Sequence, residues 1–347
     1  NEASGDHACA PEKVKSIKMD PIAIEHHATL QLQPTIEPSY ADNPNVKWTI
    51  KAGADKVKLY EGTVTILEAL NVGTATLECV ALDGGGAKTE VKVTVLEKQV
   101  KTITIKSSIP TPFHIGDKVQ FTAEIAPADA TYRDITWSVD GAAATIDATT
   151  GFLVAKTAST SLIVTAKNNS PEHQKTENYK VQINAPDVKG LKLSQNELVI
   201  KKDGKKYPVN VTLDPPSAHF NGTIKVTPAD PVIAVTCTPQ YDEYGFIIQP
   251  FKIEVEGITE GRETTVMIQP SAFPTLSATL KVKVVTDFVE PTDMELPATL
   301  TAIVGTSTKL EAKVLPETAS NRTVLWSLKD AQSAEILSID VEGNITP

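Results

Sequence analysis

The chain has 347 residues, of which 41% are apolar, and it carries a formal charge of −10. This length predicts two to four domains, because a single hydrophobic core stops growing at about 250–300 residues. The acidic balance speaks against a nucleic-acid partner, which would require clustered lysine and arginine, and no apolar run approaches the ~20 residues of a membrane-spanning helix. The 3 cysteines are too few for a disulfide framework.

The predicted elements are strands from one end of the chain to the other. Residues 1–13 lack apolar alternation and are expected to form a polar leader. Beyond them, apolar and polar residues alternate with the period of two that buries one face of a strand, most clearly at 91–95, 119–125 and 280–284. Glycines at 84–86 join two such strands and can supply the positive φ of a tight hairpin. The sequence therefore predicts an all-β protein.

A repeat divides these strands into units. The three tryptophans of the chain each follow a proline by ten residues, and a fourth proline has a lysine in the tryptophan position. The tryptophans are Trp48, Trp137 and Trp326, the lysine is Lys225, and the prolines are Pro38, Pro127, Pro215 and Pro316. Eleven residues before the prolines lie His27, Gly116, Gly204 and Gly305. Units of about 100 residues are typical of immunoglobulin-like sandwiches, so we predict tandem Ig-like β-sandwich domains in an extended rod, with the tryptophans in the cores.

The repeat also predicts the domain boundaries. These are a polar leader at 1–13, Ig-like domain 1 at 14–97, domain 2 at 98–184, a divergent domain 3 at 185–287 and domain 4 at 288–347. The connectors are short and two of them contain proline, which limits the swing between neighbours. Domain 4 is expected to be incomplete at its C-terminal end, because only four residues follow Gly343 where domain 2 continues for 33 residues past Gly151.

Domain 2 carries the most complete set of repeated motifs. In order they are Val100-Lys-Thr-Ile103, Gly116-Asp117, Pro127, Trp137-Ser138, Ile146-Asp147 and Gly151. This series resembles the bacterial immunoglobulin-like group 2 domain, and domain 4 repeats it from Gly305 to Gly343. The resemblance implies spacers and adhesive stalks of secreted or extracellular proteins at the bacterial cell surface, outer-membrane association included. It also implies a partner that is a protein or glycan on a host or neighbouring cell.

A search for chemistry finds no catalytic, cofactor-binding or metal-binding motif in the sequence. The 6 histidines do not recur at equivalent repeat positions, and the adjacent His26 and His27 are expected to face opposite ways on a strand. Nucleophile elbows, phosphate-binding glycine loops and Cys-x-x-Cys pairs are absent from the sequence. We therefore predict a non-enzymatic adhesive stalk or spacer in cell adhesion, with no cofactor and no metal.

Cys9 and Cys79 are the candidates for one disulfide. Cys9 precedes the first predicted strand of domain 1, and Cys79 lies on a later strand of the same unit. Two interpretations stay open, namely a bridge that ties the leader to domain 1 and two free thiols.

The longest insertion in the repeat lies in domain 3. Twenty residues separate Lys225 from Gly245, where fourteen separate Trp137 from Gly151, and the extra length falls around Tyr241, Asp242, Glu243 and Tyr244. Tyrosine rings can stack on sugars while carboxylates accept hydrogen bonds from sugar hydroxyls. The alternative function is therefore a glycan-binding surface protein with its ligand site on this aromatic loop. The competing interpretation is a longer loop with one tyrosine packed against the sheet.

Overall fold

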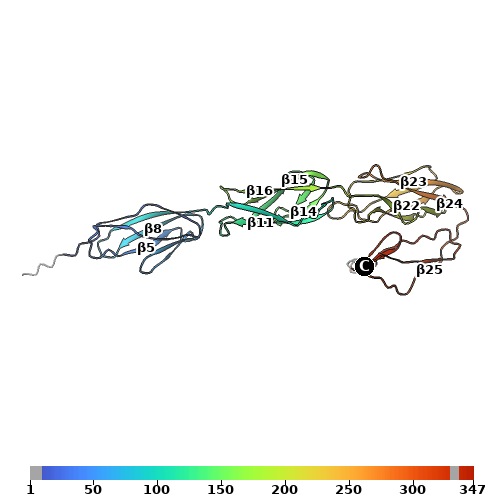
Figure 1. Ribbon diagram of the computed structural model, residues 1–347. Helices are drawn as coiled ribbons and strands as arrows, with labels where there is room; N and C mark the ends of the chain where they lie inside the picture. The colour runs from blue at the N-terminus through green and yellow to red at the C-terminus, as the bar shows by residue number, and fades with distance from the viewer. Residues whose placement is uncertain (1–9, 329–335) are drawn as a thin grey trace, which may run out of the picture.

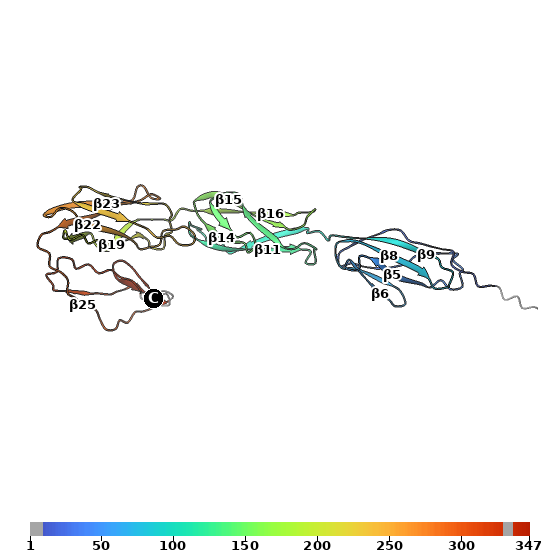
Figure 2. The ribbon, with the colours of Figure 1, turned by 180° about the vertical axis from the view of Figure 1, so that it is seen from behind.

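The computed structural model describes residues 10–328 and 336–347, and its regular structure there consists of short antiparallel and parallel strands (Figure 1). Three domains follow one another in a line, and the chain then turns back, so that the fourth domain is seen below the third in both views (Figures 1 and 2). The prediction of an all-β protein is confirmed.

Domain 1 builds its core between a four-stranded sheet and two smaller ones. The sheets have the orders β2-β9-β8-β5, β3-β7-β6 and β1-β4, with β2 parallel to β9. The strands are β1 (Ser16–Lys18), β2 (Ile22–Glu25), β3 (Thr29–Gln31), β4 (Thr35–Glu37), β5 (Val46–Ala52), β6 (Val57–Tyr60), β7 (Ile66–Ala69), β8 (Gly73–Ala81) and β9 (Lys88–Leu96).

Domain 2 is a sandwich of two sheets with the orders β10-β11-β14-β13 and β12-β15-β16. Alternate residues of β11 and β15 are buried between the sheets, because successive side chains of a strand point to opposite faces. The strands are β10 (Thr102–Ser107), β11 (Lys118–Ala126), β12 (Ile135–Val139), β13 (Ala144–Ile146), β14 (Phe152–Ala155), β15 (Ser159–Asn168) and β16 (Thr176–Ile183).

Domain 3 has the most regular sandwich, with sheets in the orders β17-β19-β22-β21 and β18-β24-β23-β20. Strand β18 lies parallel to β24, as β2 does to β9 in domain 1. The strands are β17 (Gly190–Leu193), β18 (Glu197–Ile200), β19 (Tyr207–Asp214), β20 (Ile224–Pro228), β21 (Ile233–Cys237), β22 (Phe251–Gly257), β23 (Arg262–Pro270) and β24 (Ala278–Val284).

Domain 4 contains two small sheets in its described residues, β25-β27 and β26-β29-β28. Its buried apolar residues are Val314, Ala319 and Val341. The strands are β25 (Asp293–Glu295), β26 (Thr308–Lys309), β27 (Lys313–Leu315), β28 (Ser338–Ile339) and β29 (Asn344–Thr346).

The repeated tryptophans lie at equivalent places but are not equally buried. Trp48 and Trp137 are 3% and 5% exposed, whereas Trp326 is half-buried. A glycine with positive φ packs against the indole in domains 2 and 4, where a Cβ would lie 2.8 Å from Nε1 of Trp137 and 2.6 Å from Nε1 of Trp326. These glycines are Gly151 and Gly343. Domain 3, with Lys225 at this position, fills its core with Phe220 and other phenyl rings.

The repeated prolines open a turn that ends on a buried alanine. In all four domains the N–H of the residue three positions later donates to the proline carbonyl, over 2.8–3.1 Å, and the proline follows a cis peptide bond. The alanines are Ala41, Ala130, Ala218 and Ala319, and each is less than 9% exposed. The sequence contains this Pro-x-x-Ala repeat in plain form, and it extends the repeat beyond the proline and tryptophan positions.

The fourth domain departs from the predicted extended rod, because it turns back beside the third. Val289, the linker residue bound by domain 4, lies five positions after the end of β24, whereas the equivalent Lys98 lies two positions after the end of β9. The connector bends at residues 286–287, and beyond the bend Phe288 and Glu290 contact domain 3 through Tyr207 and Lys201. The extra length lets domain 4 leave the axis set by domains 1 to 3.

Adding one methyl group at Gly151 should destabilise domain 2. In Gly151→Ala the new Cβ would meet the Phe121 carbonyl at 2.7 Å and the Trp137 ring, at a φ of +76° that L-residues avoid. We expect a loss of about 1–3 kcal/mol in the free energy of unfolding of this domain, measured by calorimetry. Gly141→Ala, where a Cβ meets nothing within 4 Å, is the control; equal stability of the two variants would contradict the packing assigned to Gly151.

Candidate functional site

The functional candidates of this molecule lie where one domain meets the next. Three domains bind the linker that enters them in the same way, through the residue four positions after the repeated proline. Its N–H donates to a linker carbonyl and its side-chain oxygen accepts from the N–H of the same linker residue. The pairs are Asp42 with Glu12, Thr131 with Lys98 and Ser320 with Val289, over 2.6–3.0 Å. We call this arrangement the linker clasp.

At the first junction, between domains 1 and 2, a histidine connects the clasp to domain 1. Nε2 of His26 lies 2.8 Å from the Leu70 carbonyl oxygen, and Nδ1 lies 3.0 Å from Oγ1 of Thr131. Because a carbonyl only accepts, Nε2 donates there, and in the neutral ring Nδ1 accepts from the Thr131 hydroxyl. The His26 side chain thereby contacts domain 1 at Leu70 and domain 2 at Thr131, whose hydroxyl also binds the linker.

The expectation that His26 and His27 face opposite ways is wrong. Strand β2 ends at Glu25, and His27 has a φ of +68°, so the pair lies in a turn and its rings stack with centroids 3.7 Å apart. His27 stands at the glycine position of the repeat and adopts the left-handed conformation of Gly116 in domain 2, whose φ is +90°.

The linker carboxylate at this junction is buried by domain 2. The Glu97 side chain is 8% exposed; both its oxygens accept from the Ser170 hydroxyl at 2.8 Å, and one lies 3.3 Å from Nδ1 of His173. Ser170 is fully buried, and its Oγ also accepts from the N–H of His173. A buried carboxylate held in this way is costly to strip of its partners, so the linker has a defined path.

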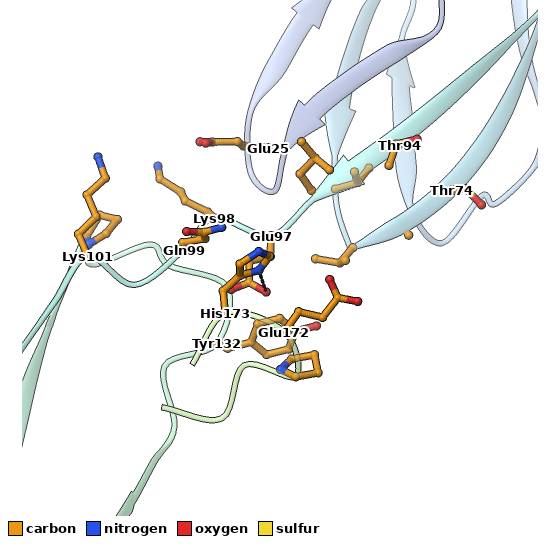
Figure 3. A pocket seen from close by; sticks show the side chains of 16 residues that line it. Glu25, Thr74, Thr94, Glu97, Lys98, Gln99, Lys101, Tyr132, Glu172 and His173 are labelled. Carbon is orange, nitrogen blue, oxygen red and sulfur yellow. Dashed lines mark ion pairs between the residues drawn. The ribbon is translucent and has the colours of Figure 1, made fainter. Parts of the chain in front are cut away.

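A cleft of about 750 Å³ opens beside this linker (Figure 3). Domain 1 contributes the ends of β8 and β9, with Thr74 and Leu96, and domain 2 contributes Tyr132 and the loop carrying Glu172. Its walls mix carboxylates, amines, prolines and one tyrosine. The cleft follows from two sandwiches meeting at a short linker, and the sequence contains no local signal for it.

The second junction, between domains 2 and 3, joins the equivalent turn and clasp position with different chemistry. His219 takes the place of the clasp residue in domain 3, and its ring lies against Gly116 so closely that a Cβ there would be 2.3 Å from Cγ. The His219 ring also meets the edge of Phe246, with ring centroids 5.5 Å apart. The turn at Gly116 is the repeat equivalent of the His26–His27 turn, so both junctions join equivalent surfaces.

The aromatic loop of domain 3 takes part in this junction. Nζ of Lys118 lies 3.9 Å from the centroid of the Tyr244 ring, and Nζ of Lys156 lies 5.3 Å from it. Lys156 also donates a hydrogen bond to the Tyr244 carbonyl. Cation–π contacts of this kind contribute about 0.5–2 kcal/mol each. A hydrogen bond with Glu243 raises the pKa of Tyr244.

The other residues of the loop have different surroundings. Oδ1 of Asp242 accepts from the N–H groups of Tyr244 and Phe246, both at 2.9 Å, so this carboxylate shapes the turn. Tyr241 is 48% exposed and donates its hydroxyl proton to the Gly222 carbonyl at 2.9 Å. The structure therefore separates the two tyrosines: one contacts domain 2 and the other faces solvent. Glycan binding by this loop stays a prediction.

Among the residues that the structure describes, the third junction, between domains 3 and 4, lacks the contact between turn and clasp position that the first two share. Lys201 pairs with Glu290 and lies 5.5 Å from the Phe288 ring, which packs on Tyr207 with centroids 6.2 Å apart. Burial and a hydrogen bond to Asp203 raise the pKa of Tyr207 to about 12. These contacts hold the connector of domain 4 against domain 3.

The proposed disulfide partners are only partly described. Cys9 lies outside the described residues. Cys79 is fully buried in the core of domain 1, opposite Trp48 in the pairing of β5 and β8, and desolvation raises its thiol pKa to about 11. The bridge with Cys9 stays a prediction.

Within residues 10–328 and 336–347, no group of three or more His, Cys, Asp and Glu side chains converges in a geometry that could hold a metal ion. A helix long and apolar enough to cross a membrane is likewise absent from these residues.

Comparisons with known proteins bear on domain 2 most directly. Residues 99–176 match the family described as bacterial Ig-like domain (group 2), which confirms the resemblance drawn from the motifs of this domain. The chain is also similar to an "Ig-like virion protein" of Serratia phage KSP90, 31% identical over 135 residues. That alignment covers 39% of this chain and 51% of the phage protein, so the chain spans about half the length of this relative.

Two solved structures are among those that the chain matches. Domains 4 and 5 of the S-layer protein SbsC are 18% identical, with 54% of this chain and 100% of that chain covered and a TM-score of 0.29. The human desmocollin-1 ectodomain is 10% identical, with 79% of this chain and 58% of that chain covered and a TM-score of 0.27.

Cys79 should be inert to thiol reagents in the folded protein. A pKa of about 11 in place of 9.0 lowers the thiolate fraction at pH 8 by about 100-fold, and burial adds a steric barrier. We expect a variant with Cys9→Ser and Cys237→Ser to react with Ellman's reagent only after unfolding. Rapid reaction of the native variant would contradict the burial of Cys79, and a mass lower by two hydrogens in the unreduced wild-type chain would establish a disulfide.

Proposed function

Residues 99–176 form a bacterial Ig-like domain of group 2, and from this premise we propose that the chain is a non-enzymatic spacer that holds its ends apart at a surface, as an adhesive stalk does. The observation that carries the proposal is the equivalence of the first two junctions. In both, the turn at the repeat glycine position of one domain meets the clasp position of the next, through His26 with Thr131 and through Gly116 with His219. Because the same kind of junction recurs, it favours a fixed direction of each domain relative to the one before it.

The polar and aromatic contacts at these junctions support a spacer that resists bending. The first junction buries the Glu97 carboxylate against Ser170 and His173, and the second places two lysines on Tyr244. Flexible tethers do not need such contacts, because a disordered linker gives reach without them. Attachment of an adhesive partner, a host or neighbouring-cell protein or glycan, is part of the proposal.

The surface that carries the spacer has two candidates. The group 2 Ig-like domain favours the bacterial cell surface, which we propose as the location. The similarity to a virion protein of a Serratia phage favours a phage particle as the second candidate. Immunogold labelling of producing cells and of purified particles distinguishes them, since gold confined to virions would overturn the cell-surface proposal.

Weakening both junctions together should turn the spacer into a flexible chain. Thr131→Val removes the hydroxyl that joins His26 and the linker, leaving polar groups unpaired at a cost of about 1–3 kcal/mol, and Tyr244→Ala removes the ring under the lysines. We expect small-angle scattering of the full chain to show a smaller radius of gyration and greater flexibility than in the wild type.

Thr136→Val combined with Tyr40→Ala, both exposed and away from the junctions, is the matched control. An equally flexible wild-type chain, or a double junction variant that scatters like the control, would overturn the fixed-spacer proposal.

Glycan binding by the aromatic loop is a second candidate function, favoured by the exposure of Tyr241 beside Glu243. Tyr241→Ala should then abolish binding on a glycan array while leaving the scattering unchanged, because this ring does not contact domain 2 through the lysines. Tyr40→Ala, which removes a tyrosine of domain 1 that is 72% exposed, serves as control. Unchanged glycan binding by Tyr241→Ala, or no binding by the wild type, would remove this candidate.

A further inference from the structure

The outer edge of β16 in domain 2 lacks the strand that covers the equivalent edge in two other domains. In domain 1, β2 lies parallel to β9 and pairs with it from Ile22↔Val93 to Glu25↔Leu96. In domain 3, β18 pairs in parallel with β24 over four residue pairs. In domain 2, β16 is the last strand of the order β12-β15-β16. Along that outer edge one isolated parallel bridge is formed among the described residues, His114↔Asn184.

The segment beside β16 does not form the covering strand. It reads Ile109-Pro110-Thr111-Pro112-Phe113, and the repeat aligns Pro110 with Pro21, which directly precedes β2 in domain 1. The Asn184 N–H donates to the Phe113 carbonyl, and the Ile115 N–H donates to the Asn184 carbonyl. Because backbone groups alternate in direction along an extended segment, Phe113 and Ile115 face β16 and the nitrogen of Pro112 faces away from it. Pairing is limited to this one bridge, and residues 109–112 lie beside β16 without pairing along it.

A groove of about 320 Å³ separates this proline segment from β16. Its walls are residues 109–113 on one side and Tyr179 to Gln182, with Asn184, on the other. Val181 is buried at the floor and Tyr179 is half-buried, packed edge-on against Phe121 with centroids 5.6 Å apart. The groove therefore combines an unpaired strand edge with an apolar floor.

The chain itself shows what fits such an edge. Strand β2 buries Ile22 and Ile24 against domain 1, and β18 buries Leu198 and Ile200 against domain 3. Both strands run parallel to the strand they cover and place branched aliphatic side chains at alternate positions. The exposed residues of β16 include both Glu177 and Lys180, so neither sign of charge dominates the edge.

We propose that the outer edge of β16 accepts an extended segment of a partner protein, added as a parallel strand. The backbone groups of β16 that do not pair with β15 would bind the segment, and the groove would take branched aliphatic side chains at alternate positions. This is a protein-docking site beyond the spacer role, and it does not depend on the straightness of the rod.

Amide hydrogen exchange of the full chain tests the proposal, with a peptide of residues 196–201 (Asn-Glu-Leu-Val-Ile-Lys) as the probe. In the free protein we expect alternate amides of Glu177–Ile183 to exchange at least tenfold faster than those of Lys281–Val284, whose edge is covered. Saturating peptide should slow these β16 amides at least tenfold. The control peptide carries Asp in place of Leu198 and Ile200 and should have no effect.

A probe that cannot donate to the edge gives an independent measurement. In domain 3 the carbonyls of Asn196 and Ile200 accept from the N–H groups of Lys281 and Val285, so even-numbered residues of this segment direct their backbone groups to the strand that they cover. The peptide N-methylated at Leu198 and Ile200 should therefore lose at least tenfold in affinity for the wild-type chain. The peptide N-methylated at Glu197 and Val199, whose N–H groups face away, is the matched control and should bind as the unmodified peptide does.

Three results would overturn the proposal. The first is protection of the β16 amides without peptide in a monomeric chain. The second is a peptide that binds nowhere or protects another strand. The third is a dimer, seen by light scattering, whose β16 amides are protected, since that would assign the edge to a second copy. None of these results depends on the scattering that tests the spacer.

Discussion

The joining of each domain to its incoming linker is the constraint on which the geometry of the molecule depends. In every domain a short turn opens on a proline and closes on a buried alanine, and in domains 1, 2 and 4 the next residue contacts the segment that enters the domain. Where that residue is Asp42, Thr131 or Ser320, a side-chain oxygen binds the linker backbone. The linker then has no freedom to rotate about its last bonds without losing two hydrogen bonds, and the direction of each sandwich is set at its entrance.

Domains 3 and 4 depart from this arrangement in different ways. Domain 3 has His219 in place of an oxygen-bearing residue, and the ring packs on the preceding domain instead of binding the linker. The loop that is longest relative to the repeat then adds Tyr244 to the same contact, against two lysines of domain 2. Domain 4 keeps the clasp but has a longer connector, which contacts domain 3 through Phe288 and Glu290.

Packing inside the domains shows how one fold tolerates different cores. In domain 2 the indole of Trp137 lies on Gly151, where a side chain has no room. Domain 3 lacks the tryptophan, and its core combines Leu, Ile and Val side chains with Phe220 and Phe251, against which the half-buried Phe273 packs. Because the free energy of apolar burial is roughly proportional to the buried area and does not depend on direction, other apolar side chains can fill a core that lacks the indole. Domain 3 therefore keeps the two-sheet sandwich without the repeated tryptophan.

Much of this protein could be predicted from its sequence, because the responsible interactions are local or repeated. Alternation with a period of two is a property of each strand, and the tryptophan, proline and glycine positions recur at fixed spacing, so the fold and the group 2 Ig-like character of domain 2 follow from the order of residues. The junctions and the open edge of β16 were decided by tertiary structure. His26 meets Thr131 across 105 positions and Lys156 meets Tyr244 across 88, and distances of this kind depend on how whole sandwiches stack, which no local pattern encodes.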